Sequence, residues 1–131
     1  MKILIIEDDV PVAQMMGILL KRVGCDVLIA HTGKTGMELA SARKFDLISL
    51  DIDLPDMNGF EICREIKQRH SSRQTPVVFI SGRRCEQDIE RGLKLGAVDY
   101  ITKPFKMDFA QRLLSHIKAK TDSVTALESA I

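Results

Sequence analysis

Short apolar runs alternate with longer amphipathic stretches along the whole chain. The first four runs hold four or five residues, are rich in Ile and Val, and lack polar alternation, which is typical of strands buried on both faces of a sheet. The last run is shorter. We predict five strands, at residues 3–6, 26–30, 46–50, 77–80 and around 100–101.

Helical spacing marks the stretches between these strands. Apolar residues recur every three or four positions at 12–23, 37–40, 60–66, 89–93 and 109–117. Pro11 suits the first turn of a helix, and Thr32 suits a helix N-cap. Each apolar stripe is narrow, so each helix is expected to cover one face of a sheet.

Five units of strand followed by helix predict an α/β fold. Strands joined by right-handed helical crossovers run parallel with helices on both faces, which gives a doubly wound five-stranded parallel sheet. Ligands of such folds bind beyond the carboxyl ends of the strands, near the point where strand order reverses. The residues of interest therefore follow Ile6, Leu50, Ile80 and Ile101.

Composition and length narrow the class of protein. A chain of 131 residues with 45% hydrophobic and 28% charged residues is ordinary for one globular domain. The net charge of +1 does not favour a protein that coats nucleic acid or a membrane. No apolar run approaches the ~20 residues that span a bilayer, and the three dispersed cysteines suit a reducing compartment. We expect a cytoplasmic protein with no membrane and no direct nucleic-acid partner.

Charged side chains are concentrated at the predicted carboxyl ends of the strands. Glu7 and Asp8 follow the first strand, Asp51 follows the third, and Lys103 follows the fifth. Neighbouring carboxylates repel one another unless protons or a cation neutralise them. An all-oxygen cluster favours a hard cation such as Mg²⁺, and a metal with a lysine would stabilise a phosphoryl group. The chemistry predicted here is phosphoryl transfer to an aspartate.

Other residues at these ends have simpler explanations. Asp9 and Asp56 are expected to cap helix N-termini. Gly59 is expected to serve backbone geometry near the start of the third helix. Lys103-Pro104 forms either a plain turn or a cis peptide bond that directs the lysine.

Four motifs, ILIIEDD, DLISLDIDLPDMNG, VVFISG and GAVDYITKPF, resemble those of the receiver domain of bacterial two-component response regulators. The resemblance extends from about Lys2 to Lys120, with the motifs in order and at ordinary spacing. It implies a flavodoxin-like (βα)5 receiver fold over residues 1–120. Residues 121–131 would then be a C-terminal tail or the start of a linker.

The same resemblance implies roles for the acidic residues. Asp51 would be the phosphoacceptor. Glu7, Asp8 and Asp51 would hold Mg²⁺, or Mn²⁺ in its place, together with the backbone carbonyl of Asp53.

The resemblance also implies a switch. Ser81 would be the hydroxyl that binds a phosphoryl oxygen, Lys103 the lysine that contacts the phosphoryl group, and Tyr100 the aromatic residue that turns inward. Asp53 and Arg83 resemble positions that tune dephosphorylation, and an acid and a base there could interact across the site.

A receiver of this kind is implied to be a regulatory phosphoacceptor with only limited self-phosphorylation and autodephosphorylation chemistry. Its donor would be a sensor histidine kinase or a histidine phosphotransfer protein. A phosphorylation-dependent homodimer is one output, and the sequence does not identify the downstream effector. Phe109 and Leu113 stand where the winged-helix subfamily often has charged dimer-bridging residues, which argues against its salt-bridged dimer.

Two alternatives stay open at this point. Asp51-Ile52-Asp53 fits the nucleophile and acid–base pair of haloacid-dehalogenase-like phosphohydrolases, although it follows the third strand and the chain lacks length for a cap. A pseudo-receiver would bind partners without phosphorylation. It would be expected to have lost a carboxylate, the hydroxyl or the lysine, and this sequence keeps all of them.

Overall fold

One parallel sheet forms the centre of the computed structural model, which describes the backbone of residues 1–130 and the side chains of residues 1–119. The strands follow the order β2-β1-β3-β4-β5. They are β1 (Lys2–Ile6), β2 (Asp26–Ala30), β3 (Leu47–Leu50), β4 (Val77–Ser81) and β5 (Asp99–Thr102). The five predicted strands are confirmed, each to within one residue at either end.

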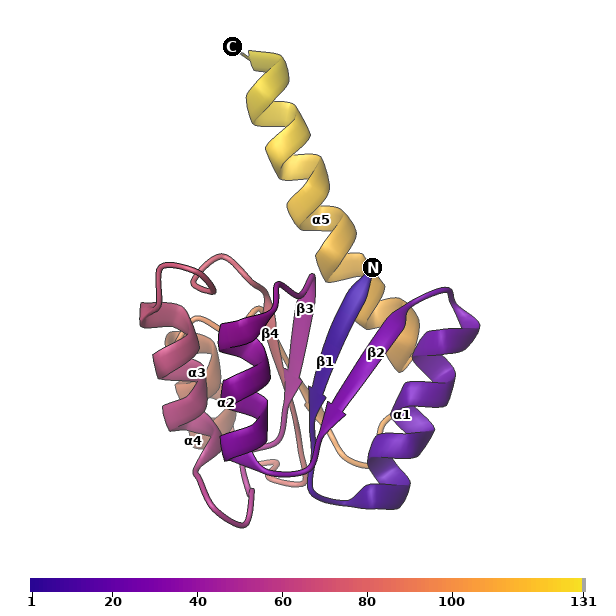
Figure 1. Ribbon diagram of the computed structural model, residues 1–131, viewed down its shortest axis with the longest axis vertical. Coiled ribbons are helices and arrows are strands. Elements are labelled where there is room, and N and C mark those ends of the chain that lie inside the picture. Colours follow the sequence, from indigo (N-terminus) through magenta and orange to yellow (C-terminus); the bar gives the residue numbers. More distant parts are fainter. Residues whose placement is uncertain (131) are drawn as a thin grey trace.

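Helices cover both faces of the sheet, as the narrow apolar stripes predicted (Figure 1). They are α1 (Val10–Arg22), α2 (Gly33–Ala42), α3 (Gly59–Gln68), α4 (Glu86–Lys94) and α5 (Phe109–Ala130). Pro11 lies in the first turn of α1, and the Thr32 hydroxyl caps α2 by accepting a hydrogen bond from the Thr35 amide at 3.2 Å. Both local expectations are therefore confirmed.

The strands divide the hydrophobic core into two layers. Along β1, Leu4 and Ile6 belong to the cluster beneath α2, α3 and α4, whereas Ile3 and Ile5 belong to the cluster beneath α1 and α5. Successive strand side chains point to opposite faces, so a strand with two covered faces is apolar at every position. All four of these side chains are fully buried.

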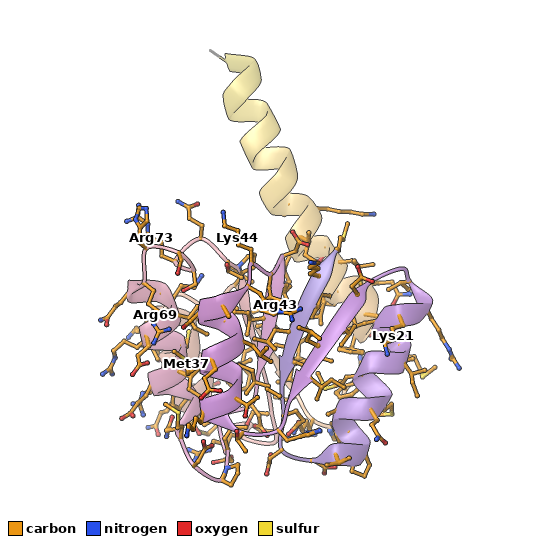
Figure 2. The ribbon with its side chains drawn as sticks, viewed as in Figure 1. Lys21, Met37, Arg43, Lys44, Arg69 and Arg73 are labelled. Carbon is orange, nitrogen blue, oxygen red and sulfur yellow. The ribbon has the colours of Figure 1, made fainter. Side chains whose placement is uncertain are left out.

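The strand order reverses between β1 and β3. From β1 the chain moves outward to β2, then returns to the other side of β1 to form β3 and continues to β5. The carboxyl ends of the strands lie at the bottom of Figure 1, and Lys44 and Arg73 lie at the opposite end in Figure 2. The switch point thus carries Glu7, Asp8 and Asp51.

The last helix continues beyond the body of the domain (Figure 1). α5 runs unbroken to Ala130, so the expected boundary between residues 120 and 121 falls inside a helix. The side chains of the expected tail lie outside the described residues, and this boundary stays a prediction. Within the described residues, no helix is long and apolar enough to cross a membrane.

Two residues at the start of α5 confirm the apolar stripe predicted for it. Phe109 is 1% exposed and Leu113 is fully buried, and both pack in the cluster beneath α1 and α5. Both lie on the apolar stripe predicted at 109–117, and this stripe faces the sheet as expected. They carry no argument for or against a dimer, because the helix turns them toward the sheet.

A polar cluster attaches α5 to the edge strand β5. The Asp99 carboxylate accepts hydrogen bonds from the Arg112 guanidinium at 2.6 and 2.7 Å, and His116 Nε2 lies 2.9 Å from Asp99 Oδ2. Burial alone would raise the pKa of Asp99. The hydrogen bonds from Arg112, His116 and the Tyr100 amide outweigh burial and bring the pKa to about 2.

This lowered pKa predicts acid sensitivity. The Asp99 pKa is about 2 in the folded chain and ~3.9 in an unfolded one, so its contribution is complete above pH ~4 and is lost as the pH falls toward 2. Asp99→Asn should lower the free energy of unfolding by about 1–2 kcal/mol at pH 7. Urea denaturation of both proteins at pH 7 and at pH 2.5 measures this. A difference that does not shrink at the lower pH would contradict the expectation.

Candidate functional site

Three carboxylates meet where β1 and β3 end. The Asp51 amide donates to the Ile6 carbonyl at 3.0 Å, which places Asp51 beside the residues that follow β1. Glu7 is 2% exposed and Asp51 6% exposed, whereas Asp8 lies at the surface. One carboxylate oxygen from each of the three residues lies within 4.8 Å of the others. The carboxylates that the sequence predicted to form one cluster are thus brought together.

Lys103 supplies the positive charge of this cluster. Its Nζ donates to Glu7 Oε1 and, at 3.2 Å, to Asp51 Oδ2. Burial alone would lower the pKa of Lys103, but the hydrogen bond to Glu7 and the charge of Asp51 outweigh burial, so the pKa is raised. The Lys103–Pro104 peptide bond is cis, the second of the two conformations considered for it.

The surroundings of Glu7 disfavour its ionised form. Burial raises the pKa of Glu7 from an ordinary 4.5 to about 7, and Asp51 adds to this shift although the Lys103 ammonium opposes it. The ammonium group of Lys103 therefore does not offset the free-energy cost of burying an ionised Glu7 beside Asp51. An additional cation would favour the ionised form of Glu7.

The donor set suits a hard divalent cation. Glu7, Asp8 and Asp51 offer only oxygen atoms, and they form the one group of three acidic, His or Cys ligands found among the described residues. Mg²⁺ typically binds one or two carboxylates and keeps several waters, so an incomplete protein cage at a partly exposed edge fits its chemistry. Mn²⁺ accepts the same oxygen ligands.

Arg83 and Asp53 form an ion pair near the acidic cluster. The Arg83 guanidinium binds the Asp53 carboxylate through Nε at 3.0 and 3.1 Å and through Nη2 at 2.6 Å. Hydrogen bonds from Arg83 lower the pKa of Asp53. The acid and the base expected to interact across the site therefore do so. The Asp53 side chain thus pairs with Arg83, and the part implied for its backbone carbonyl in holding a metal stays a prediction.

Ser81 and Tyr100 are joined through the backbone of Arg83. The Arg83 amide donates to Ser81 Oγ at 3.2 Å, and the Tyr100 hydroxyl donates to the Arg83 carbonyl at 2.7 Å. Ser81 is fully buried and Tyr100 is 7% exposed. Tyr100 is therefore buried here without a phosphoryl group, and the inward turn implied for it stays a prediction.

The backbone near Asp51 explains Gly59. A Cβ atom at Gly59 would lie 2.2 Å from the Asp51 carbonyl oxygen and 2.6 Å from Ile52 Cα. The Gly59 amide also donates to the Ile52 carbonyl at 2.8 Å. The expectation that Gly59 serves backbone geometry is confirmed, because no larger residue fits this approach.

Two contacts at this edge were missed by sequence reasoning. His31 Nδ1 lies 3.0 Å from the Glu7 carbonyl. Asp9 caps its own helix by accepting from the Val12 amide at 3.2 Å, but Asp56 binds the amides of Gly33 and Lys34 at the start of α2. Partners more than twenty positions away leave no local signal in the sequence.

The chain is similar in sequence to known proteins. A model of the response regulator receiver domain matches residues 3–118. Response regulator ArlR of Staphylococcus saprophyticus is 42% identical over 118 residues, which cover 90% of this chain and 51% of that protein. Cell cycle response regulator CtrA of Brucella ovis is 41% identical over 82% of this chain and 46% of its own length. The chain spans about half the length of these curated relatives.

Solved structures agree in fold. A CheY-like response regulator receiver domain protein from Methanospirillum hungatei superposes with a TM-score of 0.87 at 25% identity, covering 93% of this chain and 97% of that one. The receiver domain of sensor histidine kinase PA1611 from Pseudomonas aeruginosa, with magnesium coordinated in its active-site cleft, gives 0.78 at 31% identity, covering 88% and 94%. With its strand order, its acidic cluster and these matches, the chain belongs to the response regulator receiver domain family.

Proposed function

We propose that this receiver domain is a phosphorylation-dependent switch of a two-component phosphorelay and that Asp51 is its phosphoacceptor. The observation that carries the proposal is the position of Asp51, whose carboxylate is held by Lys103 beside Glu7 and Asp8 at the switch point of the sheet. A lysine and a cation on one side of a carboxylate would stabilise the charge of an incoming phosphoryl group.

The proposed donor is a phosphohistidine of a sensor histidine kinase or a histidine phosphotransfer protein. An oxygen of Asp51 forms a bond to phosphorus as the N–P bond of the phosphohistidine breaks. The electron pair of that bond returns to the imidazole nitrogen, and the product on this chain is an acyl phosphate. Lys103, which already contacts Asp51, would contact a phosphoryl oxygen.

The proposed cation is Mg²⁺, with Mn²⁺ as a substitute. Glu7, Asp8 and Asp51 would hold it together with the backbone carbonyl of Asp53, and it would supply positive charge that offsets the carboxylates and the phosphoryl oxygens. The magnesium ion in the active-site cleft of the PA1611 receiver supports this choice.

The proposed output is a change of the face formed by α4, β5 and α5. A hydrogen bond from Ser81 to a phosphoryl oxygen would alter its contact with the Arg83 amide, and the Arg83 carbonyl holds Tyr100. From Ser81 onward, this path reaches β5 through groups already in contact. It would bias two conformations that exist without phosphorylation.

The proposed role is regulation, with only limited self-phosphorylation and autodephosphorylation. We do not propose that the chain turns over a metabolite. A haloacid-dehalogenase-like activity would need Asp53 as an acid–base, and its carboxylate is instead paired with Arg83. Phosphorylation-dependent homodimerisation and a cytoplasmic location remain parts of this proposal. The three cysteines are free thiols, which is compatible with a reducing compartment.

Acetyl phosphate tests the function directly. Incubation of the protein with acetyl phosphate and Mg²⁺ should add one phosphoryl group, and EDTA should prevent the addition, because the cation offsets the charge between nucleophile and donor. Intact-mass spectrometry measures the adduct, and hydroxylamine should remove it as expected for an acyl phosphate. A protein that takes up no phosphoryl group at any Mg²⁺ concentration is the pseudo-receiver.

A further inference from the structure

A surface carboxylate joins two parts of the site that are far apart in sequence. Asp56, in the loop between β3 and α3, accepts hydrogen bonds from the Gly33 amide at 2.8 Å and the Lys34 amide at 2.9 Å. These amides open α2 and have no partner within the helix. The Thr32 hydroxyl binds the next amide, that of Thr35. Asp56 thus completes a cap that residues near α2 provide only in part.

The loop between β3 and α3 packs closely on the start of α2. A Cβ atom at Gly33 would lie 2.8 Å from Met57 Cβ, so the loop packs directly on the first residue of α2. The pKa of Asp56 is lowered, mainly by the backbone hydrogen bonds from Lys34 and Gly33. An ionised carboxylate at a helix N-terminus is also favoured by the helix dipole.

Helix α2 is itself held against β1. A Cβ atom at Gly36 would lie 2.6 Å from Ile6 Cδ1, so the first turn of α2 rests on the last residue of β1. Glu7 and Asp8 follow directly. The chain of contacts therefore runs from the acidic pair through Ile6 and α2 to Asp56.

The same loop carries Asp53 between two attachments. At its base the Gly59 amide donates to the Ile52 carbonyl at 2.8 Å, and Asp53 pairs with Asn58 in an antiparallel bridge. At its tip Asp56 binds α2. Asp56 lies three residues from Asp53 in the same loop, so a displacement of the tip would bear on the backbone of Asp53.

We propose that Asp56 is a positioning residue for the divalent cation: by binding the start of α2, it holds the Asp53 carbonyl in register with Glu7 and Asp8. The inference rests on the proposed function, because it needs the cation to bind at these residues. Groups behind the ligands of a metal commonly set its affinity by orienting those ligands. Asp56 would do so through the backbone.

Magnesium affinity is the direct test. Asp56→Ala, which removes both acceptor oxygens, should raise the Mg²⁺ dissociation constant by about three- to tenfold. Asp56→Asn keeps one acceptor oxygen without the charge and should lose clearly less affinity. Amide NMR titration of each full chain with MgCl₂ alone measures the constants, and urea denaturation of the same samples shows that they are folded.

Thr32→Ala is the matched control. It removes the other side-chain cap of α2 but leaves the loop between β3 and α3 attached, so it should lower stability without changing Mg²⁺ affinity. Equal affinity losses in Thr32→Ala and Asp56→Ala would overturn the proposal, as would unchanged affinity in Asp56→Ala. An Asn variant as weak as the Ala variant would show that the retained acceptor oxygen contributes nothing to Mg²⁺ affinity, which also overturns it. A wild-type chain that binds no Mg²⁺ would instead refute the proposed metal site.

Discussion

An Asp51→Asn variant is expected to take up no phosphoryl group from acetyl phosphate and Mg²⁺. Asparagine keeps the shape of the side chain but offers no carboxylate oxygen with the charge needed to attack phosphorus. The substitution also relieves the repulsion between Asp51 and the neighbouring carboxylates, so the variant should fold. The loss of phosphorylation should therefore be complete at an unchanged far-ultraviolet circular dichroism spectrum.

Asp53→Asn is the matched control, because it changes an aspartate two positions away whose carboxylate pairs with Arg83. It should still become phosphorylated. Borohydride reduction of the wild-type acyl phosphate, followed by peptide mass spectrometry, should place the label at Asp51. A label at Asp53, or a phosphorylated Asp51→Asn protein, would overturn the assignment of the phosphoacceptor.

A Ser81→Ala variant is expected to accept a phosphoryl group at Asp51 and yet lose most of the conformational response. The nucleophile, the acidic cluster and Lys103 remain, whereas the hydroxyl that contacts the Arg83 amide is gone. A charge-assisted hydrogen bond of ~1.5–3 kcal/mol can shift a two-state balance about tenfold or more. The loss of this hydrogen bond should therefore reduce the change in NMR shifts at Tyr100, whose hydroxyl donates to the Arg83 carbonyl.

Amide NMR shifts around Tyr100, recorded with and without beryllofluoride as a stand-in for the phosphoryl group, measure the response. Ser72→Ala is the matched control, since it removes a hydroxyl that is also buried but that lies after α3 and donates to the Ile66 carbonyl of that helix. It should respond as the wild type does. An equal response in Ser81→Ala would mean that the signal leaves Asp51 by another route.

Much of the fold follows from the sequence because its signals are local. Runs such as Ile3–Ile6 are apolar at every position, and only a strand covered on both faces requires that pattern. The caps at Asp9 and Thr32 act within three residues, so they too can be identified without a structure. The alternation of strands and helices then predicts a parallel sheet, and a parallel sheet predicts where its site lies.

The identity of the acidic cluster could also be predicted, for a related reason. Glu7, Asp8, Asp51 and Lys103 each lie within two residues of the end of a strand, and the carboxyl ends of neighbouring parallel strands meet at one edge. Position along the chain therefore specified proximity in space. Which oxygen Lys103 contacts, and the resulting rise in the pKa of Glu7, depend on burial and distances that no sequence pattern encodes.

Only the tertiary structure decided the contacts between loops. Asp56 was expected to cap a helix, but it caps α2, more than twenty positions earlier, and not the helix that follows it. Phe109 and Leu113 lie on the apolar stripe already predicted for α5, but the residues that they pack against come from α1 and the sheet. In each case the sequence determined what a residue can do, whereas the partner depended on how separate elements pack, because side-chain direction and distance are set only when the layers assemble.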